Sequence, residues 1–199
     1  MSDLDLESDQ ERSVIELEIG VESIVSAAHY GYVYALEMAT RPDGSRWLIS
    51  GSGDSDVIIW TAKPGGGLEL LKSFVDLSGA VLSLAIRDDT LLYAGLQDGE
   101  IVIWDLETFA CIRTINIHEA DVMTMSVLGG DVYTSGADGR VLRLDEAFDC
   151  TAAFDAHSGT VLDCYVIKGV KRDGWDLITA GNDAFVKVRS IRGGITVLL

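Results

Sequence analysis

A strand–turn–strand pattern occurs four times in this chain and restricts its possible folds more than any other feature. In each copy an apolar run ends in a turn rich in Gly, Asp, Asn and Ser, and a second apolar run follows. Glycine accepts the positive φ of tight turns, and aspartate hydrogen-bonds its own backbone there. The four turn aspartates, separated by 44, 40 and 45 residues, are Asp54, Asp98, Asp138 and Asp183. This period indicates a row of β units that must pack against one another.

Positions around the turns recur with the same period. Each unit has an apolar first strand, which begins with Val33, Val81, Val122 or Val161. Four residues before these valines stand His29, Leu77, His118 and His157, and directly before the turns stand Ser50, Ala94, Thr134 and Thr179. The second apolar run ends, in chain order, in Trp60, Trp104, Leu144 and Arg189. The pattern predicts an all-β chain of four units, at about 26–74, 76–116, 118–154 and 157–199.

With Trp104-Asp105 closing its second copy, the pattern resembles the WD40 repeat of β-propellers. In that family, Trp, Ser/Thr, His and Asp form a hydrogen-bonded chain inside each blade. The resemblance implies a structural network made of His29, Ser50, Asp54, Trp60, Asp98, Trp104, His118, Thr134, Asp138, His157, Thr179 and Asp183. Only the first copy has all four residue types. Because buried polar groups need partners, packing is expected to replace part of the network in the other three copies.

Four units are few for this family. Closed propellers have about 4–8 blades, and WD40 members usually have more than four. The fold expected here is therefore a WD40-type β-propeller that is present in part. The alternatives are a tight four-bladed ring and an open propeller that another chain completes. Residues 14–19 alternate apolar and acidic side chains and predict a strand before the first unit, whereas the acidic residues 1–12 predict a disordered tail.

Charge and hydropathy exclude several classes of function. The formal net charge is −17, and no basic patch with interleaved aromatic residues is visible, so nucleic-acid binding is not expected. No segment approaches the ~20 apolar residues that cross a bilayer, and the N-terminus lacks the form of a signal peptide. Three cysteines without C-x-x-C spacing indicate a reducing compartment. We expect a cytoplasmic protein, with the nucleus as an alternative.

Three patterns in the sequence could suggest chemistry, and each has a simpler interpretation. The run at 51–56 lacks the third glycine and the helix of a phosphate loop, so a hairpin turn is expected. The three histidines lie in three different units and should be spread around the ring, not gathered on a metal. Asp155, His157 and Ser158 have the residue types of a triad but no nucleophile-elbow context. No catalytic, cofactor or metal site is predicted.

A narrower resemblance rests on three segments, 28–36, 93–106 and 118–127. They are similar to the propeller in a fungal glutathione-degrading complex, and the similarity covers roughly residues 14–190. In that family a large subunit carries a WD40 propeller followed by a metallopeptidase-like domain. It pairs with a glutamine-amidotransferase-type subunit that cleaves the γ-glutamyl bond. The resemblance implies a place in an assembly and an amidotransferase-type partner.

The sequence thus predicts a non-catalytic scaffold that binds protein partners, with the oligomeric state left open. The alternative is a regulatory fragment of a metallopeptidase or γ-glutamyl hydrolase subunit without its catalytic domain. Propellers bind mostly through loops and strand starts on one face. The candidate partner-binding residues, which precede the first strand of each unit, are Tyr30, Tyr32, Ala80, Asp121 and Thr160. Exposed tyrosines are favoured as anchors because they lose little conformational entropy on binding.

Overall fold

The computed structural model describes residues 28–168, 174–192 and 195–198, and these form strands and turns. The strands group into four antiparallel sheets of four, here called blades one to four. Blade one contains β1 (Val33–Thr40), β2 (Arg46–Ser52), β3 (Val57–Ala62) and β4 (Leu68–Phe74). Blade two contains β5 (Val81–Arg87), β6 (Leu91–Leu96), β7 (Glu100–Asp105) and β8 (Cys111–Asn116). Blade three contains β9 (Val122–Leu128), β10 (Asp131–Gly136), β11 (Arg140–Leu144) and β12 (Cys150–Asp155). Blade four contains β13 (Val161–Lys168), β14 (Trp175–Gly181), β15 (Val186–Arg192) and β16 (Ile195–Leu198).

Every blade is a meander in which each strand pairs with the next one along the chain. The register also shifts at the same place in all four innermost strands. The second residue of each strand is skipped in the pairing, and these bulged residues are Tyr34, Leu82, Met123 and Leu162. A bulge adds local twist to a strand. The sequence repeat is therefore repeated in the backbone geometry down to single residues.

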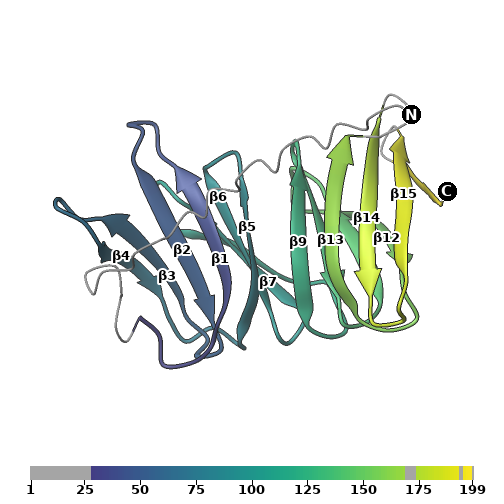
Figure 1. Ribbon diagram of the computed structural model, residues 1–199, viewed down its shortest axis with the longest axis horizontal. Helices are drawn as coiled ribbons and strands as arrows, with labels where there is room; N and C mark the ends of the chain where they lie inside the picture. The colour runs from purple at the N-terminus through teal and green to yellow at the C-terminus, as the bar shows by residue number, and fades with distance from the viewer. Residues whose placement is uncertain (1–27, 169–173, 193–194, 199) are drawn as a thin grey trace, which may run out of the picture.

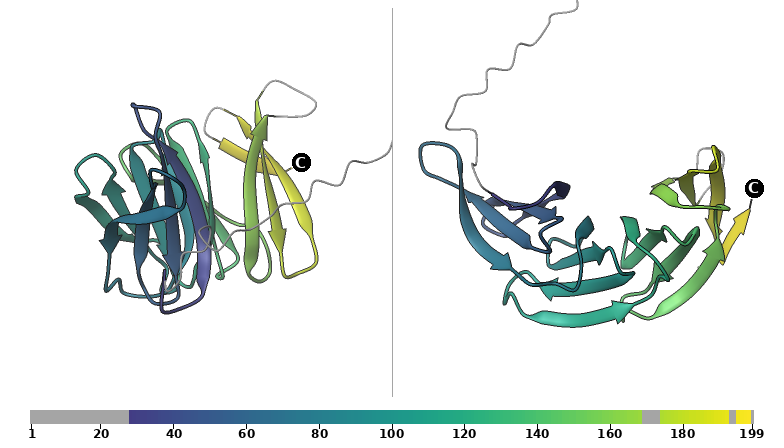
Figure 2. Two further views of the ribbon diagram at one scale, coloured as in Figure 1. Left: turned by 60° about the vertical axis from the view of Figure 1, so that its left-hand side comes forward. Right: turned by 90° about the horizontal axis from the view of Figure 1, so that it is seen from below.

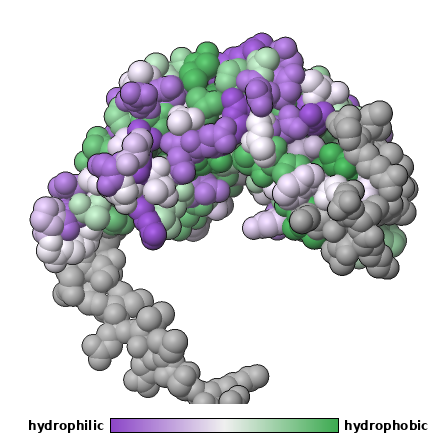
Figure 3. Space-filling view, turned by 90° about the horizontal axis from the view of Figure 1, so that it is seen from above, coloured by the Kyte–Doolittle hydropathy of each residue, from purple (hydrophilic) through white to green (hydrophobic). Residues whose placement is uncertain are grey.

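The four blades form an open crescent. The innermost strands β1, β5, β9 and β13 lie side by side in that order, and the outer strands lie on the convex side (Figures 1 and 2). The end-on view in Figure 2 shows that blades one and four stand apart at the two tips. In Figure 3 hydrophobic patches lie along the inner margin of the crescent, between hydrophilic ones. Across the described residues the four sheets do not close into a ring.

The core lies between blades. We call the side of a blade that faces the preceding blade its leading face, and the opposite side its trailing face. One cluster joins the trailing face of blade one, with Ala39, Ile49 and Ile59, to the leading face of blade two. A second cluster joins blades two and three, and a third joins blades three and four. Because β7 is sandwiched between two such clusters, its residues 101–104 are buried on both faces, as their continuous apolar pattern predicts.

Two glycines set how closely the blades approach. Gly51 and Gly95 face the first valine of the following blade. A Cβ at Gly51 would lie 2.5 Å from Val81 Cγ1, and one at Gly95 would lie 2.6 Å from Val122 Cγ1. Any larger residue would therefore force neighbouring blades apart.

The structure agrees with the predicted fold class, because it is all-β, has four four-stranded units and is open. The predicted tail at 1–12 and the predicted strand at 14–19 lie outside the described residues. Among the residues that are described, no helix is long and apolar enough to cross a membrane.

Candidate functional site

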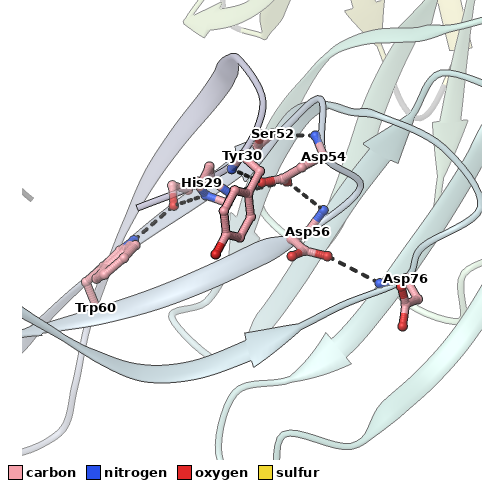
Figure 4. A network of polar contacts seen from close by, with 8 residues as sticks. His29, Tyr30, Ser52, Asp54, Asp56, Trp60 and Asp76 are labelled. Atoms are coloured by element: carbon pink, nitrogen blue, oxygen red, sulfur yellow. Dashed lines mark hydrogen bonds and ion pairs between the residues drawn. The ribbon is translucent and has the colours of Figure 1, made fainter. Parts of the chain in front are cut away.

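The polar network of blade one has all of its predicted members in contact (Figure 4). His29 Nδ1 lies 3.0 Å from the Asp54 carboxylate, and His29 Nε2 lies 2.7 Å from Ser50 Oγ. Trp60 Nε1–H donates to the same Ser50 oxygen at 2.9 Å. A proton on Nδ1 satisfies every group, because Ser50 then donates to Nε2 while it accepts from Trp60. The network therefore ties the segment before β1 to strands β2 and β3.

The carboxylate at the end of this chain also fixes the turn. Asp54 accepts the backbone N–H of Tyr30 at 2.7 Å and that of Asp56 at 3.1 Å. Ser52 Oγ accepts the N–H of Asp54 itself, at 3.2 Å. Figure 4 shows these groups converging on Asp54 from the turn and from the preceding segment. Asp54 thus connects the segment before β1 with the turn between β2 and β3.

Blades three and four keep the same arrangement without tryptophan. His118 lies 2.9 Å from both Asp138 and the Thr134 hydroxyl. His157 lies 2.7 Å from Asp183 and 3.0 Å from the Thr179 hydroxyl. Both aspartates also accept the backbone N–H of the residue after the histidine.

The positions that tryptophan would take in these two blades are filled by packing. Leu144 is fully buried in the cluster between blades two and three. The Arg189 guanidinium lies 4.4 Å above the ring of Phe154 and donates to the carbonyl of Asp155. The network and the packing residue can therefore vary separately.

Blade two lacks the network and relies on apolar contacts. Leu77 stands where histidine would be and packs against the cluster between blades one and two, and Ala94 is fully buried there. Asp98 accepts the backbone N–H of Glu100 at 3.3 Å, within its own turn. Trp104 stacks on Phe74 of blade one with ring centroids 4.6 Å apart. Here the tryptophan serves the contact between blades.

Burial and hydrogen bonding set the charge states in the blade-three network. Burial, as the largest influence, lowers the pKa of His118, although Asp138 opposes it. For Asp138 burial acts to raise the pKa, but hydrogen bonds from His118 and from backbone N–H groups outweigh it, and the net shift is downward. The favoured state is a neutral imidazole that donates to a carboxylate.

The histidines are committed to these bonds. Each of the three has one ring nitrogen on an aspartate and the other on a hydroxyl, and they lie in three different blades. Within the described residues no group of three or more His, Cys, Asp or Glu side chains could hold a metal ion. His157 bonds Asp183 and Thr179 instead of a neighbouring nucleophile, so the triad types near residue 157 are not assembled. The Cys164 thiol is buried, which raises its pKa to about 12.

The candidate partner-binding residues occupy equivalent places in the four blades. The residue before each first strand accepts the N–H of a turn residue: Tyr32 from Gly53, Ala80 from Gln97, Asp121 from Ala137, and Thr160 from Asn182. These positions therefore lie along one edge of the crescent. Tyr30 and Tyr32 are the most exposed of the five, with 97% and 80% of their surfaces accessible, whereas the other three are partly buried.

Sequence reasoning missed Arg87, which joins blades two and three. It is buried, donates to the Gly130 carbonyl at 3.0 Å, and lies 5.7 Å above the Tyr93 ring and 5.2 Å above the Phe148 ring. Within the sequence it is one charged residue at the end of an apolar strand, with no repeated equivalent. Only the position of its carbonyl partners shows its role.

Comparisons with known proteins agree with this geometry. The family described as "WD domain, G-beta repeat" matches residues 22–61. The curated "Probable di- and tripeptidase DUG2" of Saccharomyces cerevisiae is 32% identical over 140 residues, which are 62% of this chain and 16% of that protein. The "U3 snoRNP-associated protein-like EMB2271" of Arabidopsis thaliana is 27% identical over 131 residues, which are 65% of this chain and 26% of that protein. The chain thus spans a small part of these relatives.

Solved structures show the same fold. "Structure of U3-55K" aligns with a TM-score of 0.71 at 21% identity, over 86% of this chain and 52% of that one. "Crystal structure of the Saccharomyces cerevisiae Sqt1" aligns with a TM-score of 0.70 at 19% identity, over 79% of this chain and 46% of that one. This chain corresponds to about half of each solved chain. The predicted resemblance to WD40 repeats and the predicted partial propeller are confirmed.

Proposed function

We propose that this chain is a non-catalytic scaffold that binds a protein partner. It is a WD40-repeat domain folded as part of a β-propeller, and the partner contacts the edge of the crescent on which the residues before each first strand lie. The observation that carries the proposal is the rigid display of two tyrosines. The backbone N–H of Tyr30 is bonded to Asp54, and the carbonyl of Tyr32 is bonded to Gly53. Their side chains are exposed, so a fixed backbone presents two aromatic rings, of which the Tyr32 ring lies 6.2 Å from that of Tyr34. Tyrosines held in this way are common interface anchors.

The finer proposal is membership of a glutathione-catabolic complex with an amidotransferase-type subunit. It is supported by the three sequence segments at 28–36, 93–106 and 118–127, and by the 32% identity to DUG2, whose name is that of a peptidase. We place the scaffold in the cytoplasm, with the nucleus as the alternative. Both are inferences from similarity, because the fold alone serves many functions.

The test is a binding titration with the amidotransferase-type subunit from the same genome. The double variant Tyr30→Ala/Tyr32→Ala should weaken capture by about tenfold or more, because loss of an anchor costs about 1–2 kcal/mol or more. The melting temperature should stay the same, because both side chains are exposed. Ile112→Ala, an exposed apolar residue on the outer strand β8, is the matched control and should bind as the wild type does. Equal affinity of the double variant would remove this edge as the binding surface.

The second candidate is the regulatory fragment of a metallopeptidase or γ-glutamyl hydrolase subunit, which the name of the yeast relative favours. It differs from a plain scaffold in what it should do to a catalytic domain. Adding the chain to such a domain should change the turnover of a γ-glutamyl dipeptide, whereas a plain scaffold should leave it unchanged. The chain alone should show no turnover with or without Zn²⁺, and turnover would contradict the non-catalytic proposal.

A further inference from the structure

The tryptophans of blades one and two occupy the same repeat position but differ in their hydrogen bonding. In blade one the indole N–H of Trp60 donates to Ser50 Oγ at 2.9 Å. In blade two Ala94 stands at the position of Ser50 and offers no side-chain oxygen. Among the residues that the structure describes, the indole N–H of Trp104 has no acceptor, although only 3% of this residue is exposed. A group that supplies an acceptor is therefore favoured beside Trp104.

The indole nitrogen of Trp104 is not sealed inside the core. In the described part of the chain, three side-chain atoms lack a partner and are also closed off from solvent, namely the Tyr93 and Ser135 hydroxyl oxygens and Arg189 Nε. The Trp104 nitrogen is not one of them. A molecule that arrives from solvent can therefore accept this hydrogen bond.

A cleft between blades one and two opens beside this indole. Its volume is about 430 Å³, and Trp104 forms part of its wall. Phe74 and Leu77 contribute from the end of β4 and from the segment that leads into blade two, and Val102 contributes from β7. Thr114, which pairs with Val102 across the sheet, lines it from the outer strand β8. The cleft thus combines an apolar wall with one unpartnered donor.

The charged groups at this cleft are acidic. Asp76 and Glu100 line it, and no lysine or arginine is among its described lining residues. Glu100 accepts a hydrogen bond from the Ser78 hydroxyl at 2.6 Å, which holds its carboxylate in place. In a chain with a net charge of −17, these two carboxylates repel an anion. The cleft therefore suits a neutral group that has apolar surface and a hydrogen-bond acceptor.

We propose that this cleft binds a neutral apolar residue in the peptide chain of a protein partner. The backbone carbonyl of that residue accepts the Trp104 indole N–H, and its side chain lies against Phe74, Leu77 and Val102. An amide carbonyl matches the donor without adding a negative charge. The site goes beyond the scaffold function proposed above, because it lies on β7, β8 and the end of β4 and uses neither exposed tyrosine.

The first experiment tests whether the indole N–H is open. The chain has four tryptophans, whose ¹⁵N-labelled indole groups give separate NMR signals. Trp60→Phe and Trp104→Phe assign the two signals of interest, because each removes one of them. In the wild type the Trp104 N–H should exchange with deuterium at least about tenfold faster than the Trp60 N–H, which is bonded to Ser50. Equal exchange rates would overturn the proposal.

The second experiment is an NMR titration of the 199-residue chain with N-acetyl-leucinamide, a neutral apolar amide. The probe should shift the Trp104 indole signal until it saturates and leave the Trp60 signal in place. N-acetyl-leucine is the matched anionic probe. It should bind at least about threefold more weakly, because its carboxylate approaches Asp76 and Glu100.

Two variants then locate the bound amide. Ala94→Ser supplies inside the blade the acceptor that Ser50 supplies to Trp60, and it should weaken binding of the amide about fivefold. Thr114→Phe fills the cleft from an exposed position and should abolish binding. Ile112→Phe, which is also exposed on β8 but does not line the cleft, is the control and should bind as the wild type does. Thermal melts of the three variants check that each one is folded.

Two further results would overturn the proposal. One is a Trp104 signal that does not respond up to the solubility limit of the amide, which would mean that the cleft holds water only. The other is a response that Thr114→Phe leaves unchanged, which would place the bound amide elsewhere. The second result does not depend on Ala94→Ser, whose added hydroxyl lies in the core.

Discussion

Blades two and three have the same four strands and the same bulge, yet they are held together differently. Blade three has His118 bonded to Asp138 and Thr134 and a leucine at the tryptophan position. Blade two has Leu77 and Ala94 at the network positions and keeps its tryptophan, stacked on Phe74. The difference shows that the same blade backbone can be stabilised either by a fully hydrogen-bonded polar network or by apolar side chains at the same positions. A mixture of the two leaves a buried polar group without a partner.

The largest loss of stability should come from removing an apolar side chain that packs between two blades. Trp104→Ala removes a buried ring from the cluster between blades one and two and should cost about 3–5 kcal/mol of unfolding free energy. The matched change in blade three, Leu144→Ala, empties a smaller volume and should cost about 2–4 kcal/mol. Urea unfolding of both variants measures the two costs. A Trp104→Ala cost below 1 kcal/mol would show that this ring does not hold the two blades.

The turn aspartates give the next largest contrast. Asp138→Ala leaves a buried His118 N–H without its acceptor and should cost about 2–3 kcal/mol. Asp98→Ala removes one bond within an exposed turn and should cost about 1 kcal/mol or less. Thermal melts of the two variants side by side test this order. Equal losses would mean that the network contributes nothing beyond the turn, and no loss for Asp98→Ala would argue against its place in the repeat.

A partial polar network in blade two should make the protein less stable than no network at all. Leu77→His replaces an apolar contact with a ring for which Asp98, at the repeat position of Asp138, is the expected partner of one nitrogen. The other nitrogen has no hydroxyl partner because residue 94 is alanine, so the change should cost about 1–2 kcal/mol. Adding Ala94→Ser supplies that hydroxyl and should recover about half of the loss. The same urea titrations apply. Greater instability of the double variant would mean that the blade-two backbone cannot hold the network.

The smallest expected effect is the pH dependence that His118 contributes. Its pKa in the folded chain lies below the ordinary value of 6.5. As the pH falls through 6.5, the unfolded chain therefore binds a proton that the folded chain does not, and stability is lost. This contribution is complete above pH 6.5 and declines below it. The wild type should lose more of its melting temperature than His118→Gln over about pH 5 to 8. If the melting temperatures of the wild type and of His118→Gln changed equally with pH, the result would contradict the lowered pKa of His118.

Residue patterns that act locally allowed much of the fold and network to be predicted. The Asp-containing turns, the alternating strands and the His-to-Asp spacing all depend on short stretches of chain and on hydrogen-bonding capacity. The resemblance to WD40 repeats implied the His–Asp and His–Thr bonds of blades three and four, because both blades keep the residue types of that pattern. Arg87 could not be predicted in this way, because its carbonyl partners at residues 130, 145 and 146 belong to another blade.

The sequence by itself determined the repeat, the strands and the turn chemistry of this protein, since each blade carries that information within about 40–45 residues. Only the tertiary structure decided which faces are covered. Leu36 and Leu84 are the same residue at the same repeat position, and one is exposed while the other is buried. The physical reason is that burial depends on the neighbouring blade and not on the residue. The repeat sequence therefore specifies the residues of each sheet face, and the arrangement of the blades determines whether another blade covers that face.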